Sequence, residues 1–368
     1  MNILITTFFR AHNYGAMLQA YALQKILKER NYNVEFLNYH DKDIDKHYKI
    51  IYTQGENIIM KFKAIIASFY YLPINIKRYQ VFKKFQNQYL ITTKQVYKNE
   101  YEVKQNPPCS DIYITGSDQV WSSNSDRNLS DIYTLNFGDD KTKRISYAAS
   151  IGLDKLSDKQ KEIYKVKLKK IDYMSVREIT AKRILSDIYK EDINVVLDPT
   201  LLLSKDEWDF FCDDIQPVPE KYILVYIVNK NDQCTRIVNE LSSITGLKVI
   251  HFGRGKKYEN ILKSSYSEGP KEFVKLIQNA EYIVTTSFHA TVFSIIFNKK
   301  FWVVPHQVTG SRVIDLLNEL DLSERMVFTY NDFLTKNYDS KIDFENAIKV
   351  IEKQKSASIK WLFDVIDS

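Results

Sequence analysis

The chain alternates short apolar runs with longer stretches in which apolar residues recur every three or four positions. Near the start, residues 3–7 predict a strand, and Leu18, Ala22 and Ile26 share one face of the helix expected after it. A second strand is expected at residues 34–37. Strand, helix and strand in this order form a βαβ unit, which implies a parallel sheet with a right-handed crossover.

The alternation resumes after residue 110 and continues to the end of the chain. Strands are expected at 111–115, 144–149, 173–176, 194–197, 222–228, 248–252, 282–285 and 301–304, with helices near 179–188, 231–244, 270–278, 312–320 and 341–366. The polar, proline-bearing stretch 213–220 indicates a domain boundary. We therefore expect an α/β fold with an N-terminal domain over 1–212, a C-terminal domain over 221–340 and a closing helix over 341–368 that packs back on the assembly. Two Rossmann-like domains facing across a cleft resemble the architecture called GT-B.

Residues 41–108 interrupt this rhythm and are interpreted as a helical insertion. Two helical stretches are expected, near 56–72 and 76–90. In the first, an apolar stripe that includes Ile58, Phe62 and Ile66 accompanies two lysines, a pattern that also suits a helix lying on a membrane surface. Because apolar stripes usually face a core, we favour a helix packed on its own domain.

The amino-acid composition is that of a globular protein. Of 368 residues, 44% are hydrophobic and 27% charged, as in ordinary globular proteins, and the net charge of +6 is spread along the chain. Such a diffuse charge suits an anionic substrate or an acidic membrane face better than nucleic acid. The three cysteines show no C-x-x-C spacing, no signal-peptide pattern opens the chain, and no apolar run is long enough to cross a bilayer. We expect a cytoplasmic protein without a structural zinc site.

Candidate chemistry lies where the expected strands end, since parallel α/β sheets bind ligands at the carboxyl ends of their strands. His289 stands between the strand at 282–285 and an apolar helix. An imidazole there can exchange protons with an anion held by the helix N-terminus. A histidine that caps the helix or packs in the core is an equally good explanation.

The loop Gly-Ser-Asp-Gln-Val-Trp at 116–121 follows another strand. Asp118 and Gln119 suit sugar hydroxyls, with Trp121 as an apolar platform, although a turn capped by Ser117 or Asp118 is the alternative. We favour a binding role. Gly15, where the first helix opens, would let backbone approach a ligand, but a tight turn explains it as well.

Three basic groups also follow strands or open helices. The guanidinium of Arg177 suits a carboxylate or phosphate, unless it pairs with neighbouring Glu178. Arg312 opens a helix and would add a second anion contact. The basic loop 251–257, which contains Arg254, suits phosphate, although a solvated surface loop is the commoner explanation. Neither G-x-G-x-x-G nor a P-loop occurs, which disfavours dinucleotide-binding and NTPase functions.

Taken in order, these pieces resemble the polysaccharide pyruvyl transferase family. The motifs are G-S-D-Q-V-W at 116–121, A-S-I-G at 149–152, V-R-E at 176–178, D-P-T-L-L-L at 198–203, S-F-H-A-T-V-F-S at 287–294 and S-R-x-x-D-L-L at 311–317. The resemblance extends from Asn13 to Leu320. It implies a GT-B-like enzyme that transfers pyruvate from phosphoenolpyruvate (PEP) onto sugar hydroxyls as a cyclic ketal, with Arg177 and His289 binding or activating PEP.

The resemblance also sets the expected site. PEP is the donor substrate, and neither a cofactor nor a metal is expected. Donor-binding residues would be Arg177, Ser287, Phe288, Thr291, Arg312 and Arg254; acceptor-binding residues would be Asn13, Gly15, Gln119 and Trp121; His289 and Asp118 would be catalytic. Some family members carry arginine two positions before the histidine, where this chain has Ser287. Either Arg312, Arg254 or Lys256 supplies the positive charge, or this subgroup uses another donor.

The expected acceptor is a lipid-linked or nucleotide-linked sugar used in cell-surface polysaccharide assembly. Contact with the inner face of the membrane would then be peripheral, and nucleic acid is not an expected partner. Two alternatives remain at this point. One is a nucleotide-sugar glycosyltransferase with the same architecture, and the other is a non-catalytic carbohydrate-binding relative, to which Ser287 draws attention.

Overall fold

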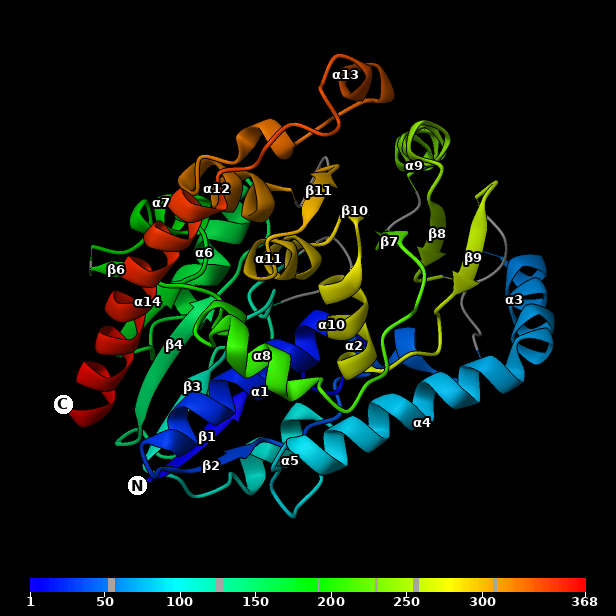
Figure 1. Ribbon diagram of the computed structural model, residues 1–368. Helices are drawn as coiled ribbons and strands as arrows, with labels where there is room; N and C mark the ends of the chain where they lie inside the picture. The colour runs from blue at the N-terminus through cyan, green and yellow to red at the C-terminus, as the bar shows by residue number, and fades with distance from the viewer. Residues whose placement is uncertain (52–56, 124–128, 191, 229–230, 254–257, 307–309) are drawn as a thin grey trace.

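Two parallel β-sheets, each covered by helices, make up the molecule (Figure 1). The computed structural model describes residues 1–51, 57–123, 129–190, 192–228, 231–253, 258–306 and 310–368. The expected α/β class with two parallel sheets is confirmed. Among the described residues, no helix is both long and apolar enough to cross a membrane.

The first sheet and its helices occupy the N-terminal part of the chain. In order, the elements are β1 (Asn2–Thr6), α1 (Tyr14–Glu29), β2 (Asn33–Phe36), α2 (Lys42–Asp45), the 3-10 turn η1 (Lys46–Tyr48), α3 (Ile58–Tyr70), α4 (Leu72–Tyr89), α5 (Glu100–Gln105), β3 (Ile112–Thr115), β4 (Lys143–Ala149), α6 (Asp158–Lys167), β5 (Tyr173–Val176), α7 (Ile179–Ser186), β6 (Ile193–Val195), η2 (Pro199–Leu201) and α8 (Lys205–Phe211). The strands are apolar and β-branched because both faces of a parallel sheet are buried. In β3, for example, all four residues are buried.

The second sheet follows from residue 222. Its elements are β7 (Tyr222–Tyr226), α9 (Asp232–Thr245), β8 (Lys248–His251), β9 (Ile261–Ser264), α10 (Pro270–Asn279), β10 (Tyr282–Thr285), α11 (Phe288–Ile296), β11 (Lys300–Val303), α12 (Ser311–Glu319), η3 (Ser323–Arg325), α13 (Tyr330–Leu334) and α14 (Phe344–Asp367). The sequence pattern did not predict β9. Its Ile-Leu-Lys-Ser sequence lies half-exposed at the edge of the sheet, so it carries no long apolar run.

The order of the strands in each sheet determines which strand ends are neighbours. The first sheet runs β2-β1-β3-β4-β5-β6, and the second runs β11-β10-β7-β8-β9. In the first sheet, β2 lies on one side of β1 and β3 on the other, so the chain reverses direction across the sheet between β1 and β3. In the second sheet, the same reversal occurs between β7 and β10. A crevice forms beyond the carboxyl ends of the strands at each reversal. Loops that leave β3 and β10 therefore start at the two positions where such sheets bind ligands.

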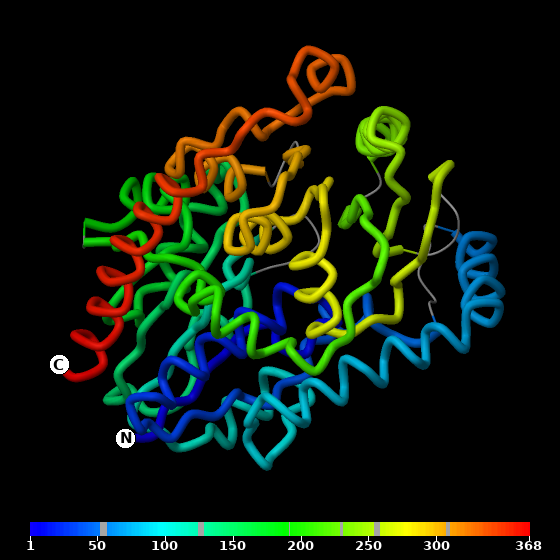
Figure 2. The backbone as a smooth tube through the Cα atoms, viewed as in Figure 1, coloured from blue at the N-terminus to red at the C-terminus, as the bar shows by residue number. Residues whose placement is uncertain are grey.

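The two halves share one hydrophobic core. At its centre the Tyr14 ring of α1 stacks on the Phe273 ring of α10, with the centroids 4.6 Å apart. Near the end of the chain, α14 returns to the first sheet (Figure 2). There the Ser358 hydroxyl accepts from the Leu197 backbone N–H, and Lys143 donates to carbonyls of the last turn. The closing helix therefore packs back on the N-terminal half, as expected.

The insertion between β2 and β3 contains two different helices. α4 packs on its own domain, with Phe82 and Phe85 buried. From α4, Arg78 donates to the backbone carbonyls of His12 and Tyr266 and to the Tyr14 hydroxyl, which joins the insertion to both halves. The preferred prediction for the preceding helix is wrong, because most of the apolar side chains of α3 are exposed.

Replacing Arg78 by alanine should lower the free energy of unfolding by about 3 kcal/mol, because two carbonyls and a hydroxyl lose their charged donor. Urea denaturation of the full chain measures this change. As a control, Arg183→Ala removes an exposed arginine that makes one long contact, and should stay within about 0.5 kcal/mol of the unchanged protein. Equal losses in both variants would contradict a joining role for Arg78.

Candidate active site

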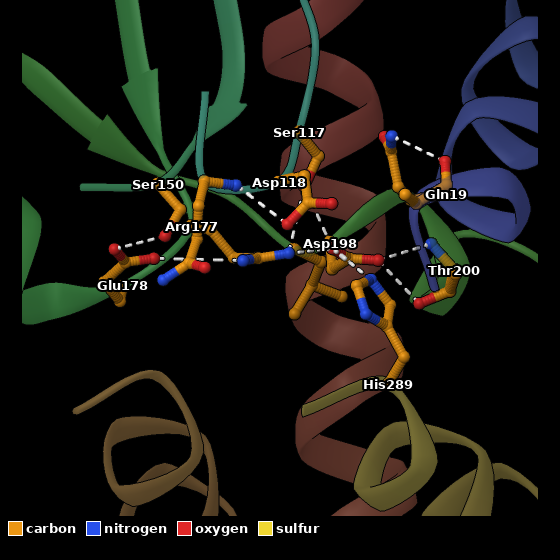
Figure 3. Close-up of polar contacts among 12 residues, drawn as sticks. Gln19, Ser117, Asp118, Ser150, Arg177, Glu178, Asp198, Thr200 and His289 are labelled. Carbon is orange, nitrogen blue, oxygen red and sulfur yellow. Dashed lines mark hydrogen bonds and ion pairs between the residues drawn. The ribbon is translucent and has the colours of Figure 1, made fainter. Parts of the chain in front are cut away.

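A buried carboxylate, Asp198, lies at the centre of the site (Figure 3). It follows β6 and caps η2, where its Oδ1 accepts from the Thr200 N–H at 3.0 Å and from the Thr200 hydroxyl at 2.6 Å. The Asp-Pro-Thr sequence produces this local structure, since an aspartate before proline commonly caps the turn that proline begins. One carboxylate oxygen is thereby fixed, and the other faces the space between the two halves.

The second carboxylate oxygen, Oδ2, is contacted by side chains from both halves of the molecule. Arg177 Nη1 donates to Asp198 Oδ2 at 2.6 Å, and the Ser117 hydroxyl donates to it at 2.9 Å. From the other half, His289 Nε2 lies 3.5 Å from the same oxygen. The guanidinium and the imidazole thus converge on one carboxylate, as the strand-end positions suggested.

The charges around Asp198 keep its carboxyl group ionised. Burial by itself raises the pKa of Asp198, but the facing charges of His289 and Arg177 and the hydrogen bond from Thr200 outweigh it. The pKa of Asp198 therefore lies well below the usual aspartate range. At neutral pH the carboxylate can hold a guanidinium and orient an imidazole without giving up its charge.

Arg177 keeps donors available for a ligand. Its guanidinium stacks on the Phe288 ring at 4.4 Å from the centroid, and Nε lies 3.8 Å from Glu178 Oε2. Within the described parts of the chain, Nε and Nη2 have no hydrogen-bond partner. Because a buried donor without a hydrogen bond is costly, we expect Nη2 to meet an anion, whereas Nε faces Glu178.

The neighbouring Glu178 has a structural task. Its Oε1 accepts from the Ser150 hydroxyl at 2.8 Å and from the backbone N–H groups of Ile151 and Gly152 at 3.1 and 3.3 Å. Burial raises the pKa of Glu178, while Arg177 and Arg312 act against that rise. The A-S-I-G and V-R-E motifs therefore contact each other through Glu178, and this contact holds the loop after β4 in place.

A cavity of about 140 Å³ opens beside this cluster. It is lined by Asn13, Asp118, Gln119, Val228, Thr286, Ser287, Phe288, His289, His306, Gly310, Arg312 and Val313. Seven of these lining residues were predicted as site residues, and they come from both halves: the first turn of α1, the loop after β3, the start of α11 and the start of α12.

Several cavity groups are suited to an anion. Ser287 caps α11, so the N-terminus of that helix, with its free N–H groups, faces the cavity. Burial and the charge of Arg177 lower the pKa of Arg312 to about 10, which leaves it protonated at neutral pH. In the described residues, neither Arg312 Nε nor His289 Nε2 makes a hydrogen bond.

Asp118 is held in an unusual backbone conformation. Its φ is +85°, although it is not glycine, and its Oδ1 accepts from the Gln119 N–H at 2.8 Å. Strain of this kind persists where the surrounding structure enforces it, often at functional sites. Across the loop, a Cβ at Gly152, whose φ is +65°, would lie 2.1 Å from Gln119 Nε2. The positive φ favours glycine at this position, and a Cβ there would displace the Gln119 amide.

Two predicted acceptor contacts are structural. Gly15 approaches a side chain instead of a ligand, because a Cβ at that position would lie 2.0 Å from His289 Nδ1. Trp121 is fully buried and its indole N–H donates to the Tyr133 carbonyl, so the prediction of an exposed platform is wrong. Asn13 lines the cavity and also caps α1 by accepting from the Ala16 N–H.

Among the predicted donor contacts, Thr291 also needs correction. Its hydroxyl is buried and donates to the Ser287 carbonyl one helical turn earlier, so it does not face a ligand. Arg254 and Lys256 lie outside the described residues. Asp198 and Ser117 were given no binding or catalytic role from sequence, although both follow predicted strands within recognised motifs, which was the available signal. In the described ranges, no cluster of three or more His, Cys, Asp or Glu side chains is arranged to hold a metal.

Comparisons with known proteins concern the family and the fold. A family model described as polysaccharide pyruvyl transferase matches residues 13–307. The fold is similar to UDP-N-acetylglucosamine 2-epimerase from Rickettsia bellii, with a TM-score of 0.55, 11% identity and coverage of 100% of this chain and 96% of that one. It is also similar to S. aureus MnaA solved with UDP, with a TM-score of 0.52, 12% identity and coverage of 100% and 97%. No curated protein matches in sequence. At these identities the likeness shows the fold alone, which is the expected GT-B-like architecture.

Replacing Asp198 by asparagine should lower the free energy of unfolding at pH 7 by about 3 kcal/mol, since it leaves the Arg177 charge buried without its partner. Because the folded-state pKa of Asp198 is lowered, its ionised form stabilises the fold above the unfolded pKa of about 4, and this stability is lost as pH falls further. Urea denaturation between pH 7 and pH 3 should show the two proteins converging below about pH 4.

The exposed Asp154 offers a matched control. Asp154→Asn makes the same chemical change where the side chain faces solvent, and should alter stability by less than about 0.5 kcal/mol. A stability difference between Asp198→Asn and the unchanged protein that stays constant down to pH 3 would mean that the Asp198 charge is not what stabilises the site.

Proposed function

The chain belongs to the polysaccharide pyruvyl transferase family, and we propose that it transfers pyruvate from PEP to two hydroxyls of a sugar, forming a cyclic ketal. The acceptor would be a lipid-linked or nucleotide-linked glycan precursor. The observation that carries this proposal is the convergence of Arg177 and His289 on Asp198, beside a cavity lined by both halves.

The donor carries about three negative charges, one on its carboxylate and about two on its phosphate. Arg177 and Arg312 each keep at least one unpartnered N–H donor, and the N-terminus of α11 adds backbone N–H groups. This combination suits a small, highly charged ligand, because guanidinium groups bind carboxylate and phosphate in two-point fashion. In this proposal, Arg312 supplies the positive charge that family members with arginine at the position of Ser287 would place there.

The reaction needs a proton at the methylene carbon of PEP. Its delivery would give a cation-like centre at the neighbouring carbon, to which one sugar hydroxyl adds. Phosphate then leaves with the enol oxygen, and the second hydroxyl closes the ketal. Of the two hydroxyl protons released, one replaces the proton spent on the methylene carbon and the other leaves with phosphate or solvent. His289 is proposed to move these protons, with Asp198 orienting its ring.

The acceptor would lie against the loop after β3. Asp118 and Gln119 line the cavity opposite α11, together with Asn13 of α1. A carboxylate and two amides can hold several hydroxyls at once, since they combine acceptors with donors. Asp118 is proposed to orient or deprotonate the attacking hydroxyl, and the sugar-platform role expected of Trp121 is not part of this proposal.

Replacing His289 by glutamine should lower kcat for phosphate release from PEP about 10²–10⁴-fold, because the proton-transfer group is lost while the ring's volume is largely kept. The assay uses isolated protein, PEP and sugar acceptors, and measures acceptor-dependent phosphate. The exposed His47→Gln provides the control and should leave the rate unchanged.

The same assay separates the proposal from its alternatives. Turnover of a UDP-sugar in place of PEP would identify a glycosyltransferase. Binding of a sugar without turnover of either donor would identify a non-catalytic relative. If His289→Gln retained full activity, the histidine would be structural and the proposed proton transfer would be wrong.

Replacing Arg312 by glutamine should weaken PEP binding about tenfold or more, because one charge-assisted contact is lost from the donor site. Isothermal calorimetry with PEP measures the dissociation constant. Arg236→Gln is the control, since Arg236 lies over the Tyr330 ring and is not among the residues that line the cavity. An unchanged dissociation constant for Arg312→Gln would remove Arg312 from the donor site.

A further inference from the structure

Helix α3 exposes an unusual amount of apolar side chain. Seven of its thirteen residues are exposed large hydrophobics, namely Ile58, Ile59, Met60, Phe62, Ile66, Phe69 and Tyr70. Ile58 is 82% exposed, Phe62 66% and Tyr70 80%. Soluble proteins rarely leave a contiguous apolar surface of this kind without a binding function.

These side chains form one stripe along the helix. Because an α-helix completes a turn every 3.6 residues, Ile58, Phe62, Ile66 and Phe69 follow one another on the same face. Ile59 and Tyr70 widen that face. The same geometry puts Lys61 at one border of the stripe and Lys63 at the other, and both are exposed. The opposite face contains Ser68, the only buried residue of α3.

The helix stands away from the body of the protein. Figure 1 shows α3 at the edge of the molecule, beyond the far end of α4 and remote from the first sheet. Its one substantial packing partner among the described elements is α4. The stripe is therefore a convex surface on a projecting helix, and not the wall of a groove shaped for a peptide.

The surrounding segment is strongly basic. Residues 57–99 contain eight lysines and arginines and no aspartate or glutamate. The whole chain has 52 basic and 46 acidic residues, so outside this segment acidic residues outnumber basic ones by two. The expectation of a charge spread along the chain is therefore wrong, because the whole positive excess lies in α3, α4 and residues 90–99. A surface of this composition is complementary to a negatively charged partner.

We propose that α3 docks the protein on the surface of a membrane that contains anionic lipids. The helix would lie in the plane of the interface, with its apolar stripe among the acyl chains. Lys61 and Lys63, on either border, would place their ammonium groups at the level of the headgroups while their stems cover apolar surface. The remaining basic residues of α4 add long-range attraction to the anionic surface. This inference stands independently of the reaction proposed above.

Vesicle sedimentation of the full chain tests the docking. The protein should bind vesicles of mixed phosphatidylglycerol and phosphatidylcholine, bind phosphatidylcholine alone about tenfold or more weakly, and lose its preference for the anionic vesicles as salt is raised. Phe62→Ser combined with Ile66→Ser should weaken binding at least about tenfold, since two apolar side chains that would enter the membrane are lost. The matched control is Phe210→Ser with Phe328→Ser, which changes equally exposed side chains elsewhere and should bind normally.

A charge-reversal pair tests the electrostatic part. Lys61→Glu with Lys63→Glu should abolish the preference for anionic vesicles, whereas Lys155→Glu with Lys159→Glu, on the exposed surface near α6, should retain it. All four variants alter exposed side chains, so unchanged melting temperatures are expected and confirm folding.

Three outcomes would overturn the proposal. The first is failure of the unchanged protein to bind anionic vesicles. The second is binding of the α3 variants that equals binding of their controls. The third concerns dimer formation. Light scattering without lipid would show a dimer that Phe62→Ser with Ile66→Ser dissociates, in which case a second copy of this chain covers the stripe. Because none of these measurements uses PEP or an acceptor, they do not depend on the enzymatic activity.

Discussion

The site depends on a single ionised carboxylate. Asp198 holds Arg177 from its own half, receives Ser117 from the loop after β3 and faces His289 from the other half. An isolated buried charge is expensive, and its cost is offset only because every side of the carboxyl group meets a donor or a positive charge. The cluster therefore depends on β3, β5 and β6 ending at the same edge of the first sheet.

The sequence predicted the assembly of the cavity well, for a simple geometric reason. In parallel sheets, all strands end at the same edge, so polar residues that follow strands meet in space. Asp118, Gln119, His289 and Arg312 all follow a strand or open a helix, and all line one cavity. The apolar runs that mark strands are also the strongest local signal in this chain, which is why the two sheets were recognisable.

What the sequence did not predict depends on neighbours distant along the chain. Trp121 follows the same strand as Asp118, but its indole turns into the core because a carbonyl there accepts its N–H. Gly15 has to be glycine because of an imidazole 274 positions later. The exposure of α3 has the same origin, since an apolar stripe looks alike whether or not another element covers it. Local pattern identifies candidates, and tertiary contact decides their roles.

The placement of Asp198 and His289 on separate halves has a consequence for the timing of the reaction. The N-terminal half contributes the carboxylate, the guanidinium and the glycine surface against which the imidazole rests, whereas the other half contributes the ring itself. In the proposed reaction, protons would be moved only where the two halves bring the imidazole, the carboxylate and the guanidinium together. Assembly of the site from both halves would then protect the bound enol phosphate from protonation until the site is complete.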